Sequence, residues 1–451
     1  MADEEVDKTP EDEETAETPD SQQEEQTGAG EEPQAAETEA PAAEESAEAE
    51  AVAAEETPEA TTAEQLAQES PAATLISPNV GFVREIIGAG GDSLKKCYQC
   101  AQCSVVCNIT PDENPFPRKE MMWAQWGLKE KLIGNADIWL CHQCADCTAN
   151  CPRGAEPGRV MQAIGRLTLG HYSRPGFLAR ALGSPKALLA LIALPLLVIL
   201  VSLGAQGSFD LNAIPRGDDG GIVYRNFMNV HLIDAIYTVV FLFAAGTMVL
   251  GAYSYWKDMT RNAIGEGKTL SGGLISNIVP TVTEILSHRR FNKCETTKSR
   301  TISHMFLFYS FIGLLITTTW AAFYTNIMKM NSPYTMVDPL KIVGNTSAVA
   351  FLVGMTLILV NRFRNAEKAG IGNYYDWLLI VLIYNVGVSG IFTEVIRLAN
   401  LSVYLAYPMY VLHLVSVLFL FLYAPYSKMA HMMYRAIAMV FARAAGREPA
   451  S

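Results

Sequence analysis

Six long apolar segments limit this chain more than any other feature of its sequence. They lie near residues 186–206, 228–256, 302–327, 343–361, 377–398 and 402–427. Each has the roughly 20 residues that a helix needs to cross the ~30 Å hydrocarbon core of a bilayer. Helices buried in water-soluble proteins rarely reach this length without charged residues. The sequence therefore predicts an all-α protein whose larger part is a six-helix transmembrane bundle.

Lysine and arginine are distributed unequally between the connections that join these segments. The connections 256–301 and 361–376, together with the C-terminal end, carry 15 of them. The opposite connections carry four, which are Arg216, Arg225, Lys329 and Lys341. Because basic loops stay on the cytoplasmic side, we expect a multi-pass protein of the cytoplasmic (inner) membrane with both termini in the cytoplasm.

Eight of the nine cysteines lie in two copies of the spacing C-x2-C-x2-C-x3-C. Disulfide frameworks are typical of short secreted chains, and structural zinc usually takes two separated C-x2-C pairs, so neither fits well. The spacing is typical of [4Fe–4S] clusters, and in bacterial two-cluster proteins the fourth cysteine of each run ligates the other cluster. It predicts a first cluster on Cys97, Cys100, Cys103 and Cys151 and a second on Cys141, Cys144, Cys147 and Cys107. The first run departs from the usual pattern in ending Cys107-Asn108 instead of Cys-Pro.

Composition divides the chain into four parts. Residues 1–80 hold 25 acidic residues and one lysine, so this segment has a net charge of −24. The whole chain has a net charge of −13, so the remaining residues carry +11. A segment of this kind buries too little apolar surface to fold, so we expect a disordered acidic tail. Apolar residues at helical spacing between and after the cysteine runs predict a helical ferredoxin-like domain with two [4Fe–4S] clusters at 81–175. A transmembrane domain at 176–435 and a C-terminal tail at 436–451 complete the expected organisation.

Four histidines lie in or at the ends of apolar segments, where ionisable groups are costly and mark functional sites. His413 and His431 are 18 residues apart, which is five turns and about 27 Å along one face of a helix. His231 matches the expected depth of His413 on the outer side, and His304 matches His431 on the inner side. These pairs predict two b haems between facing helices; one haem, or ordinary interfacial histidines, are the alternatives. No C-x-x-C-H sequence occurs, so a c-type haem is not expected.

Two carboxylates are candidates for a quinone and proton site. Asp234 lies one helical turn after His231, and Glu394 lies near the outer end of the fifth segment. A quinone takes up protons with electrons, and a carboxylate beside a haem can supply them. The alternative for Glu394 is an ion pair with Arg397 on the adjacent turn.

The remaining histidines and the ninth cysteine carry weaker signals. His142, inside the second cysteine run, either tunes its cluster or simply packs there. We expect His171 and His288 to be solvated in basic loops. Cys294 is expected to be a bystander thiol.

The fusion of two cysteine runs with a histidine-bearing bundle resembles the QmoC family, the membrane subunits of quinone-interacting membrane-bound oxidoreductases of sulfate reducers. The resemblance covers about residues 90–440. The stretch from "CYQCAQCSVVC" to "CHQCADCTANCPRG" is similar to the iron–sulfur HdrC subunits of heterodisulfide reductases. The second part is similar to cytochrome b subunits of heterodisulfide and nitrate reductases, and the latter use two histidines of their last span, as His413 and His431 would be here.

This resemblance implies electron exchange between the menaquinone pool and cytoplasmic flavin/iron–sulfur subunits of the same complex (QmoA- and QmoB-like), which serve adenylylsulfate reductase in sulfate respiration. The chain has no P-loop and no G-x-G-x-x-G, so nucleotide or flavin binding is not expected, and neither is a nucleic-acid partner. It also lacks the Cys-Cys-Gly element of disulfide-reducing subunits. The alternative function is a membrane anchor and iron–sulfur wire for a heterodisulfide reductase-like complex, without quinone chemistry of its own.

Overall fold

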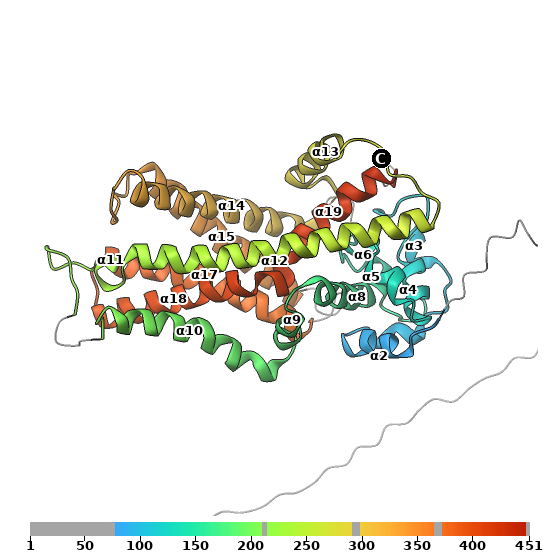
Figure 1. The fold of residues 1–451 in the computed structure, drawn as a ribbon, viewed down its shortest axis with the longest axis horizontal. Coiled ribbons are helices and arrows are strands. Elements are labelled where there is room, and N and C mark those ends of the chain that lie inside the picture. Colours follow the sequence, from blue (N-terminus) through green and yellow to red (C-terminus); the bar gives the residue numbers. More distant parts are fainter. Residues whose placement is uncertain (1–76, 210–213, 291–297, 365–371, 448–451) are drawn as a thin grey trace, which may run out of the picture. The chain divides into compact units, whose positions relative to one another are not determined.

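The computed structural model describes residues 77–209, 214–290, 298–364 and 372–447 (Figure 1). The predicted acidic tail up to residue 76 and Cys294 lie outside these ranges. The described residues are folded into helices joined by turns and loops, and they contain no β-strand. The predicted all-α fold is therefore confirmed for this part of the chain.

The predicted ferredoxin-like domain at 81–175, which we call the cluster domain, consists of short helices that pack around α8 (Pro157–Tyr172). Proline at the first position of α8 suits a helix start, and its apolar face buries Val160, Met161 and Ile164. The predicted helical connection between the cysteine runs is also present. The other elements are α2 (Val80–Gly88), η1 (Asp92–Lys96), α3 (Gln102–Val105), α4 (Arg118–Gln125), α5 (Lys129–Ile133), α6 (Asp137–Leu140) and α7 (Asp146–Ala149).

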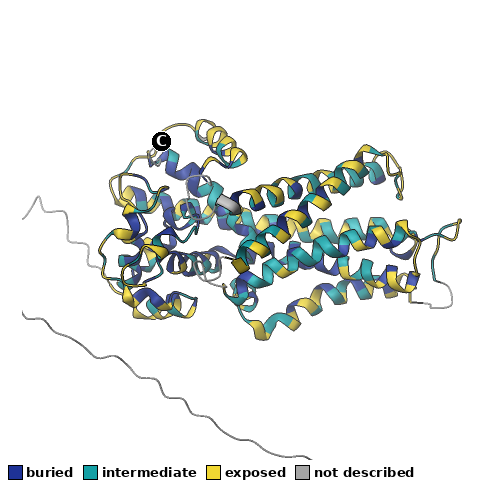
Figure 2. Ribbon diagram, turned by 180° about the vertical axis from the view of Figure 1, so that it is seen from behind, coloured by how far each residue is buried: buried dark blue, intermediate teal, exposed yellow. Residues whose placement is uncertain are grey.

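Six helices of the described residues are long and apolar enough to cross a membrane, as predicted. They are α10 (Leu188–Ala205), α12 (Val230–Gly265), α14 (Lys298–Asn326), α15 (Pro339–Arg364), α17 (Tyr374–Leu398) and α18 (Val403–Tyr423). Figure 2 shows buried residues concentrated in the cluster domain and exposed ones along the long helices. The exposed residues include large apolar side chains such as Leu189, Phe241 and Val353, which is the surface that a helix presents to lipid.

One expected geometry is wrong, because His413 and His431 do not share a helix. Helix α18 ends at Tyr423, and two 3-10 turns, η5 (Ala424–Tyr426) and η6 (Lys428–Ala430), precede α19 (His431–Ala444). Pro425 lacks the N–H that would continue the helix, and Ser427 is extended. The five-turn spacing along one face therefore does not apply.

The segment expected as a C-terminal tail from residue 436 is also folded. Helix α19 continues to Ala444 and buries Tyr434, Ala438 and Phe441. These residues recur at intervals of four and three, so they form one apolar stripe along the helix. The stripe packs α19 against the cluster domain and α12.

A continuous core joins the cluster domain to the bundle. Helix α12 has 36 residues and is about 54 Å long at 1.5 Å per residue, so its second half extends beyond the hydrocarbon core. There Tyr255 and Tyr172 pack with ring centroids 5.3 Å apart, and Tyr434 lies 5.5 Å from Tyr255. A Cβ on Gly251 would meet the Tyr434 hydroxyl at 2.4 Å, so glycine is required for this close approach.

Three short helices complete the described fold. They are α9 (Gly176–Leu182), α11 (Tyr224–Phe227) and α13 (Leu274–Ser287), and η2 (Pro185–Ala187) leads into α10. Helix α13 packs on α19. It lies in the basic connection between the second and third long helices, where the sequence analysis expected a loop.

Candidate redox site

The two cysteine loops have the same backbone conformation. Gln99 and Gln143 have positive φ values of 59° and 52°. In each loop this turn lets the backbone N–H donate to the thiol two residues earlier, and both N···Sγ distances are 3.4 Å, to Cys97 and to Cys141. The two loops also begin α3 and α7 with a left-handed alanine. The repeated spacing in the sequence therefore becomes a repeated local fold.

The packing of α3 on α7 brings the fourth thiol of each run to the other loop. Cys151 lies close enough to Cys97 and Cys103 for their charges to interact. Cys107 has the same relation to Cys141, Cys144 and Cys147. These are the two sets of the crossed assignment, and ligation itself stays a prediction.

The described cysteine thiols form no ready site for a single metal ion. In the part of the chain that the structure describes, no three His, Cys, Asp or Glu side chains are grouped so as to hold one metal ion. Tetrahedral zinc would need thiolates about 3.8 Å apart. Burial raises the pKa of the Cys103 and Cys107 thiols to about 11, so iron binding by these thiols would release protons.

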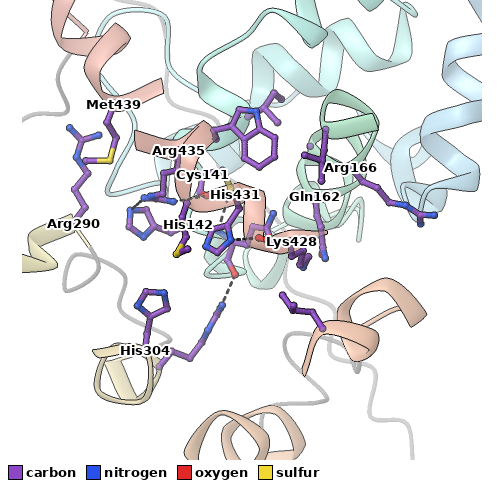
Figure 3. A pocket seen from close by; sticks show the side chains of 18 of the residues that line it. Cys141, His142, Gln162, Arg166, Arg290, His304, Lys428, His431, Arg435 and Met439 are labelled. Carbon is purple, nitrogen blue, oxygen red and sulfur yellow. Dashed lines mark hydrogen bonds between the residues drawn. The ribbon is translucent and has the colours of Figure 1, made fainter. Parts of the chain in front are cut away.

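A cavity of about 340 Å³ lies where the second cysteine loop meets the bundle (Figure 3). Its wall includes Cys141, and Glu284 is the one carboxylate among the described residues that line it. Four histidines and five cations also line it: His142, His288, His304, His431, Arg166, Arg290, Arg300, Lys428 and Arg435. The cavity therefore combines an excess of positive charge with imidazoles beside a predicted cluster ligand.

His288 is buried in this cavity, so the prediction of a solvated side chain is wrong for it. Its Nε2 lies 3.2 Å from His304 Nδ1. Helix α13 ends at His288 in the left-handed region, with φ 52°. The amphipathic pattern of α13 was the available signal in the sequence, but it indicates burial of His288 only once α13 is known to pack against α19. His171, by contrast, is exposed as predicted, although it lies in the last turn of α8 and not in a loop.

His431 is held by the turn before it. Its Nδ1 contacts the Lys428 carbonyl, which leaves Nε2 as the nitrogen available to a metal. The Lys428 ammonium pairs with Asp376, whose carboxylate also accepts two contacts of 2.8 and 2.9 Å from Gln162 Nε2. Residues of η6, α17 and α8 thus fix the position of His431.

The other predicted haem pair is arranged differently. His413 is half-buried between α18 and α17, where its Nδ1 lies 3.1 Å from Ser389 Oγ. A Cβ on Gly390 would come within 3.0 Å of its ring. His231 is exposed at the start of α12, and its backbone N–H donates to Asn229 Oδ1. No described contact joins His231 to His413.

Neither candidate carboxylate lines the histidine cavity. Asp234 accepts a hydrogen bond of 2.8 Å from Asn326 Nδ2 on α14. Glu394 pairs with Arg397 at 2.9 Å and with Lys341 at 2.7 Å. The ion-pair alternative for Glu394 is therefore realised, with a lysine that the sequence analysis did not connect to it.

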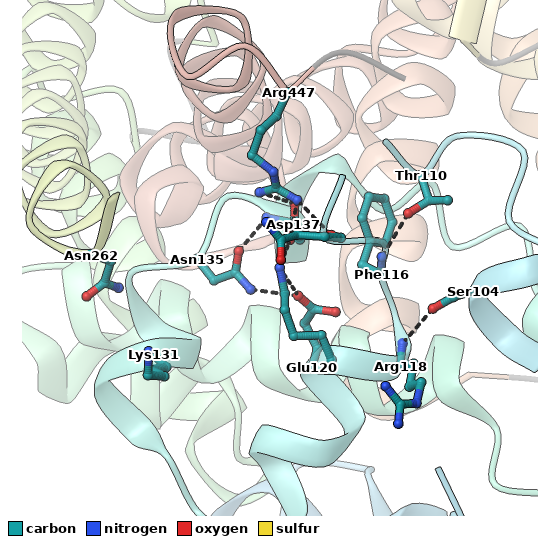
Figure 4. A network of polar contacts seen from close by, with 12 residues as sticks. Ser104, Thr110, Phe116, Arg118, Glu120, Lys131, Asn135, Asp137, Asn262 and Arg447 are labelled. Atoms are coloured by element: carbon teal, nitrogen blue, oxygen red, sulfur yellow. Dashed lines mark hydrogen bonds and ion pairs between the residues drawn. The ribbon is translucent and has the colours of Figure 1, made fainter. Parts of the chain in front are cut away.

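A second buried network attaches the C-terminal end to the cluster domain (Figure 4). Asp137 accepts from Arg447 at 3.0 Å and from Lys119 at 2.8 Å. Asn135 Nδ2 donates to Glu120 Oε1 at 2.8 Å. Burial and the neighbouring Asp137 raise the pKa of Glu120 to about 8. The Glu120 Oε2 has no hydrogen-bond partner among the described residues, which suits a protonated carboxyl.

Comparison with known proteins identifies the cysteine region. Residues 93–155 match the family model of the 4Fe-4S dicluster domain. The chain is 32% identical over 103 residues to a subunit of the H(2):CoB-CoM heterodisulfide,ferredoxin reductase of Methanothermobacter marburgensis, covering 22% of this chain and 52% of that protein. It is 25% identical over 207 residues to a subunit of the dihydromethanophenazine:CoB--CoM heterodisulfide reductase of Methanosarcina thermophila, covering 43% and 75%.

A third relative covers more of the chain. Citrate utilization protein B of Escherichia coli is 24% identical over 370 residues, which are 77% of this chain and 89% of that protein. The chain spans about half the length of the Methanothermobacter relatives that it matches. A comparison with solved structures gave no significant match. The chain thus joins a 4Fe-4S dicluster domain to six helices that are long and apolar enough to cross a membrane.

Proposed function

We propose that this chain is the membrane subunit of an oxidoreductase complex that exchanges electrons between the (mena)quinone pool and cytoplasmic flavin/iron–sulfur partner subunits. The electrons pass through b haem and two [4Fe–4S] clusters. The observation that carries this proposal is that Cys141 lines the same cavity as His304 and His431. A cluster and a metal-ligating histidine pair at one cavity form a short route between membrane and cytoplasm.

The side chains of the cavity fit a b haem, which supplies one-electron chemistry when bound. His304 and His431 provide two imidazoles, and the Nδ1 of each contacts a neighbour, His288 for His304 and the Lys428 carbonyl for His431. The cavity's arginines and lysine complement two propionate carboxylates. Phe308 supplies an apolar wall.

The cluster thiols suggest the order of transfer. Cys100 is the exposed member of the eight cysteines, so the first cluster comes closest to the surface. Cys141 faces the cavity, so the second cluster is nearest the haem. Electrons then exchange in the order haem, second cluster, first cluster and partner.

The partners and the membrane side belong to the same proposal. The excess of basic residues in the connections that flank the cluster domain supports a cytoplasmic position. The similarity to subunits of two heterodisulfide reductases supports membership of a multi-subunit reductase. QmoA- and QmoB-like subunits, adenylylsulfate reductase and a role in sulfate respiration rest on the resemblance of the sequence to the QmoC family.

The quinone site is proposed at the end of the bundle away from the cluster domain. Asp234 remains the candidate proton carrier, held by Asn326 of α14. Glu394 is assigned instead to an ion pair network with Lys341 and Arg397 that joins α15 to α17. A second haem on His231 and His413 would belong to this end, but the geometry does not favour it, because no described contact joins the two histidines and His413 is packed against Gly390.

The alternative function, a membrane anchor and iron–sulfur wire without quinone chemistry, is favoured by one observation. His231 and His413 make no described contact, and His413 is tightly packed against Gly390. A bundle that serves only to dock a partner needs no cofactor there.

A reduced-minus-oxidised visible spectrum of the purified chain separates the two functions. The electron-transfer function predicts the α-band of a b haem and one or two haems per chain by pyridine haemochrome. Iron and sulfide analysis of the same sample checks that both clusters are present. A preparation with full cluster content and no α-band would support the anchor.

A further inference from the structure

We propose that Arg300 and Arg435 are positioning residues that fasten the second cysteine loop to the two helices carrying His304 and His431, and that their charges raise the reduction potential of the second cluster. The inference deepens the proposed function and rests on it. It concerns residues that the sequence analysis did not single out.

Both arginines donate to backbone carbonyls of the second cysteine loop. Arg435 Nη1 donates to the Cys141 carbonyl at 3.3 Å, and its Nη2 contacts the His142 ring. Arg300 Nη1 donates to the Gln143 carbonyl at 2.9 Å. The loop is therefore held by guanidinium groups at two carbonyls two residues apart.

The two arginines hold matching positions on their helices. Arg435 follows His431 by four residues on α19, and Arg300 precedes His304 by four residues on α14. Residues four apart lie on the same face of a helix. Each helix thus contributes one imidazole and one guanidinium to the lining of the cavity, and Figure 3 shows His431 and Arg435 of α19 and His304 of α14.

Electrostatics gives the pairing a consequence for the cluster. A guanidinium stays charged at all accessible pH values. Positive charge in a partly buried site stabilises the reduced, more negative form of an iron–sulfur cluster, and cluster potentials respond to net charge and hydrogen bonds. The exchange moves one electron, so one group is oxidised as the other is reduced and no bond is made or broken.

The first cysteine loop provides an internal comparison. Arg118 Nε donates to the Gln99 carbonyl at 2.8 Å, which is the position equivalent to the Gln143 carbonyl. Arg118 is exposed and lies in the cluster domain, on α4. Water and salt screen such a charge, so its effect on the first cluster is the smaller one.

The test is a redox titration of the purified full chain followed by EPR of both clusters. Arg435→Gln and Arg300→Gln each lower the potential of the second cluster and leave the first unchanged. The expected shift for the double variant is at least tenfold in the oxidised-to-reduced ratio, or about 59 mV for a one-electron couple. Arg435→Lys keeps the charge and most of the potential. Arg443→Gln is the control on the same helix, since Arg443 pairs with Glu284.

Iron, sulfide and haem analysis of every variant establishes that the cofactors are retained. With full cofactor content, an unchanged second cluster, or equal shifts of both clusters, overturns the inference. If Arg435→Gln loses the second cluster, the potential of that cluster can still be measured in Arg435→Lys and Arg300→Gln. Absence of haem from the wild-type chain contradicts the proposed function alone, because the cluster titration does not depend on haem.

Discussion

The two ends of the helical bundle place their histidines in different surroundings. At the end next to the cluster domain, four histidines line a cavity of about 340 Å³ together with Cys141. At the far end, His413 is packed against Ser389 and Gly390, and His231 is exposed on α12. The near end has a cavity between its histidines, whereas at the far end His413 is packed against α17 and His231 lies on the surface.

The difference teaches what a histidine pattern in a membrane sequence establishes. Cost of burial marks all four membrane histidines as candidates, but only packing decides which of them face a common space. At the near end, Arg300 and Arg435 also contact the second cysteine loop. The far end has Asp234 with an amide and Glu394 with two cations, which is a network of paired charges.

The largest expected effect concerns the cluster beside the near end. Cys107→Ser removes the fourth thiol of the second cluster, which then loses its EPR signal, while the first cluster is retained. Cys151→Ser gives the reverse result. EPR of the reduced chain, with iron quantitation, is the measurement. Loss of the first cluster in Cys107→Ser, with the second retained, would contradict the crossed assignment.

A smaller effect tests how tightly the far end is packed. Gly390→Ala places a methyl group 3.0 Å from the His413 ring, which is held by Ser389, so we expect the free energy of unfolding to fall by about 1–3 kcal/mol. Gly246→Ala is the matched control, because nothing lies within 4 Å of its Cβ and removal of a helical glycine stabilises by about 0.5–1 kcal/mol. Thermal unfolding in detergent is the measurement. Equal behaviour of the two variants would show that the far end has room.

The smallest effect concerns the buried network around Asp137 and Glu120 that attaches the C-terminal end to the cluster domain. Burial raises the pKa of Glu120 from 4.5 to about 8, so between these values the folded state binds more protons than the unfolded state. Stability therefore falls as pH rises through this window, because ionising the buried carboxyl beside Asp137 costs free energy in the folded state. Glu120→Gln removes this dependence in thermal unfolding from about pH 5 to 8.5. The exposed Glu113→Gln is the control, and a slope that persists in Glu120→Gln contradicts the assignment.

The sequence predicted the features that depend on local spacing. The six helices follow from apolar length, and the two cysteine loops follow from a repeated spacing that folds the same way twice. The predicted shared helix of His413 and His431 is wrong because Pro425 interrupts the apolar run between them and α18 ends before it. Its missing N–H was the available signal.

Long-range contacts account for what the sequence did not predict. His288 is buried only because α13 packs on α19. Arg300 meets Gln143 across 157 residues of chain, and Arg435 meets Cys141 across 294. Lys341 reaches Glu394 from a different helix. No periodicity or motif within one segment marks such pairs.

Haem content of histidine variants tests the central claim most directly, which is that the cavity beside the second cysteine loop holds a haem on His304 and His431. Pyridine haemochrome with potentiometric titration should show that His304→Ala and His431→Ala lose the same haem, while His171→Ala retains full content. His231→Ala and His413→Ala should leave this haem at its wild-type content and potential, because neither histidine lines the cavity. If His304→Ala and His431→Ala lose different haems, or if both retain the wild-type amount, the account is contradicted.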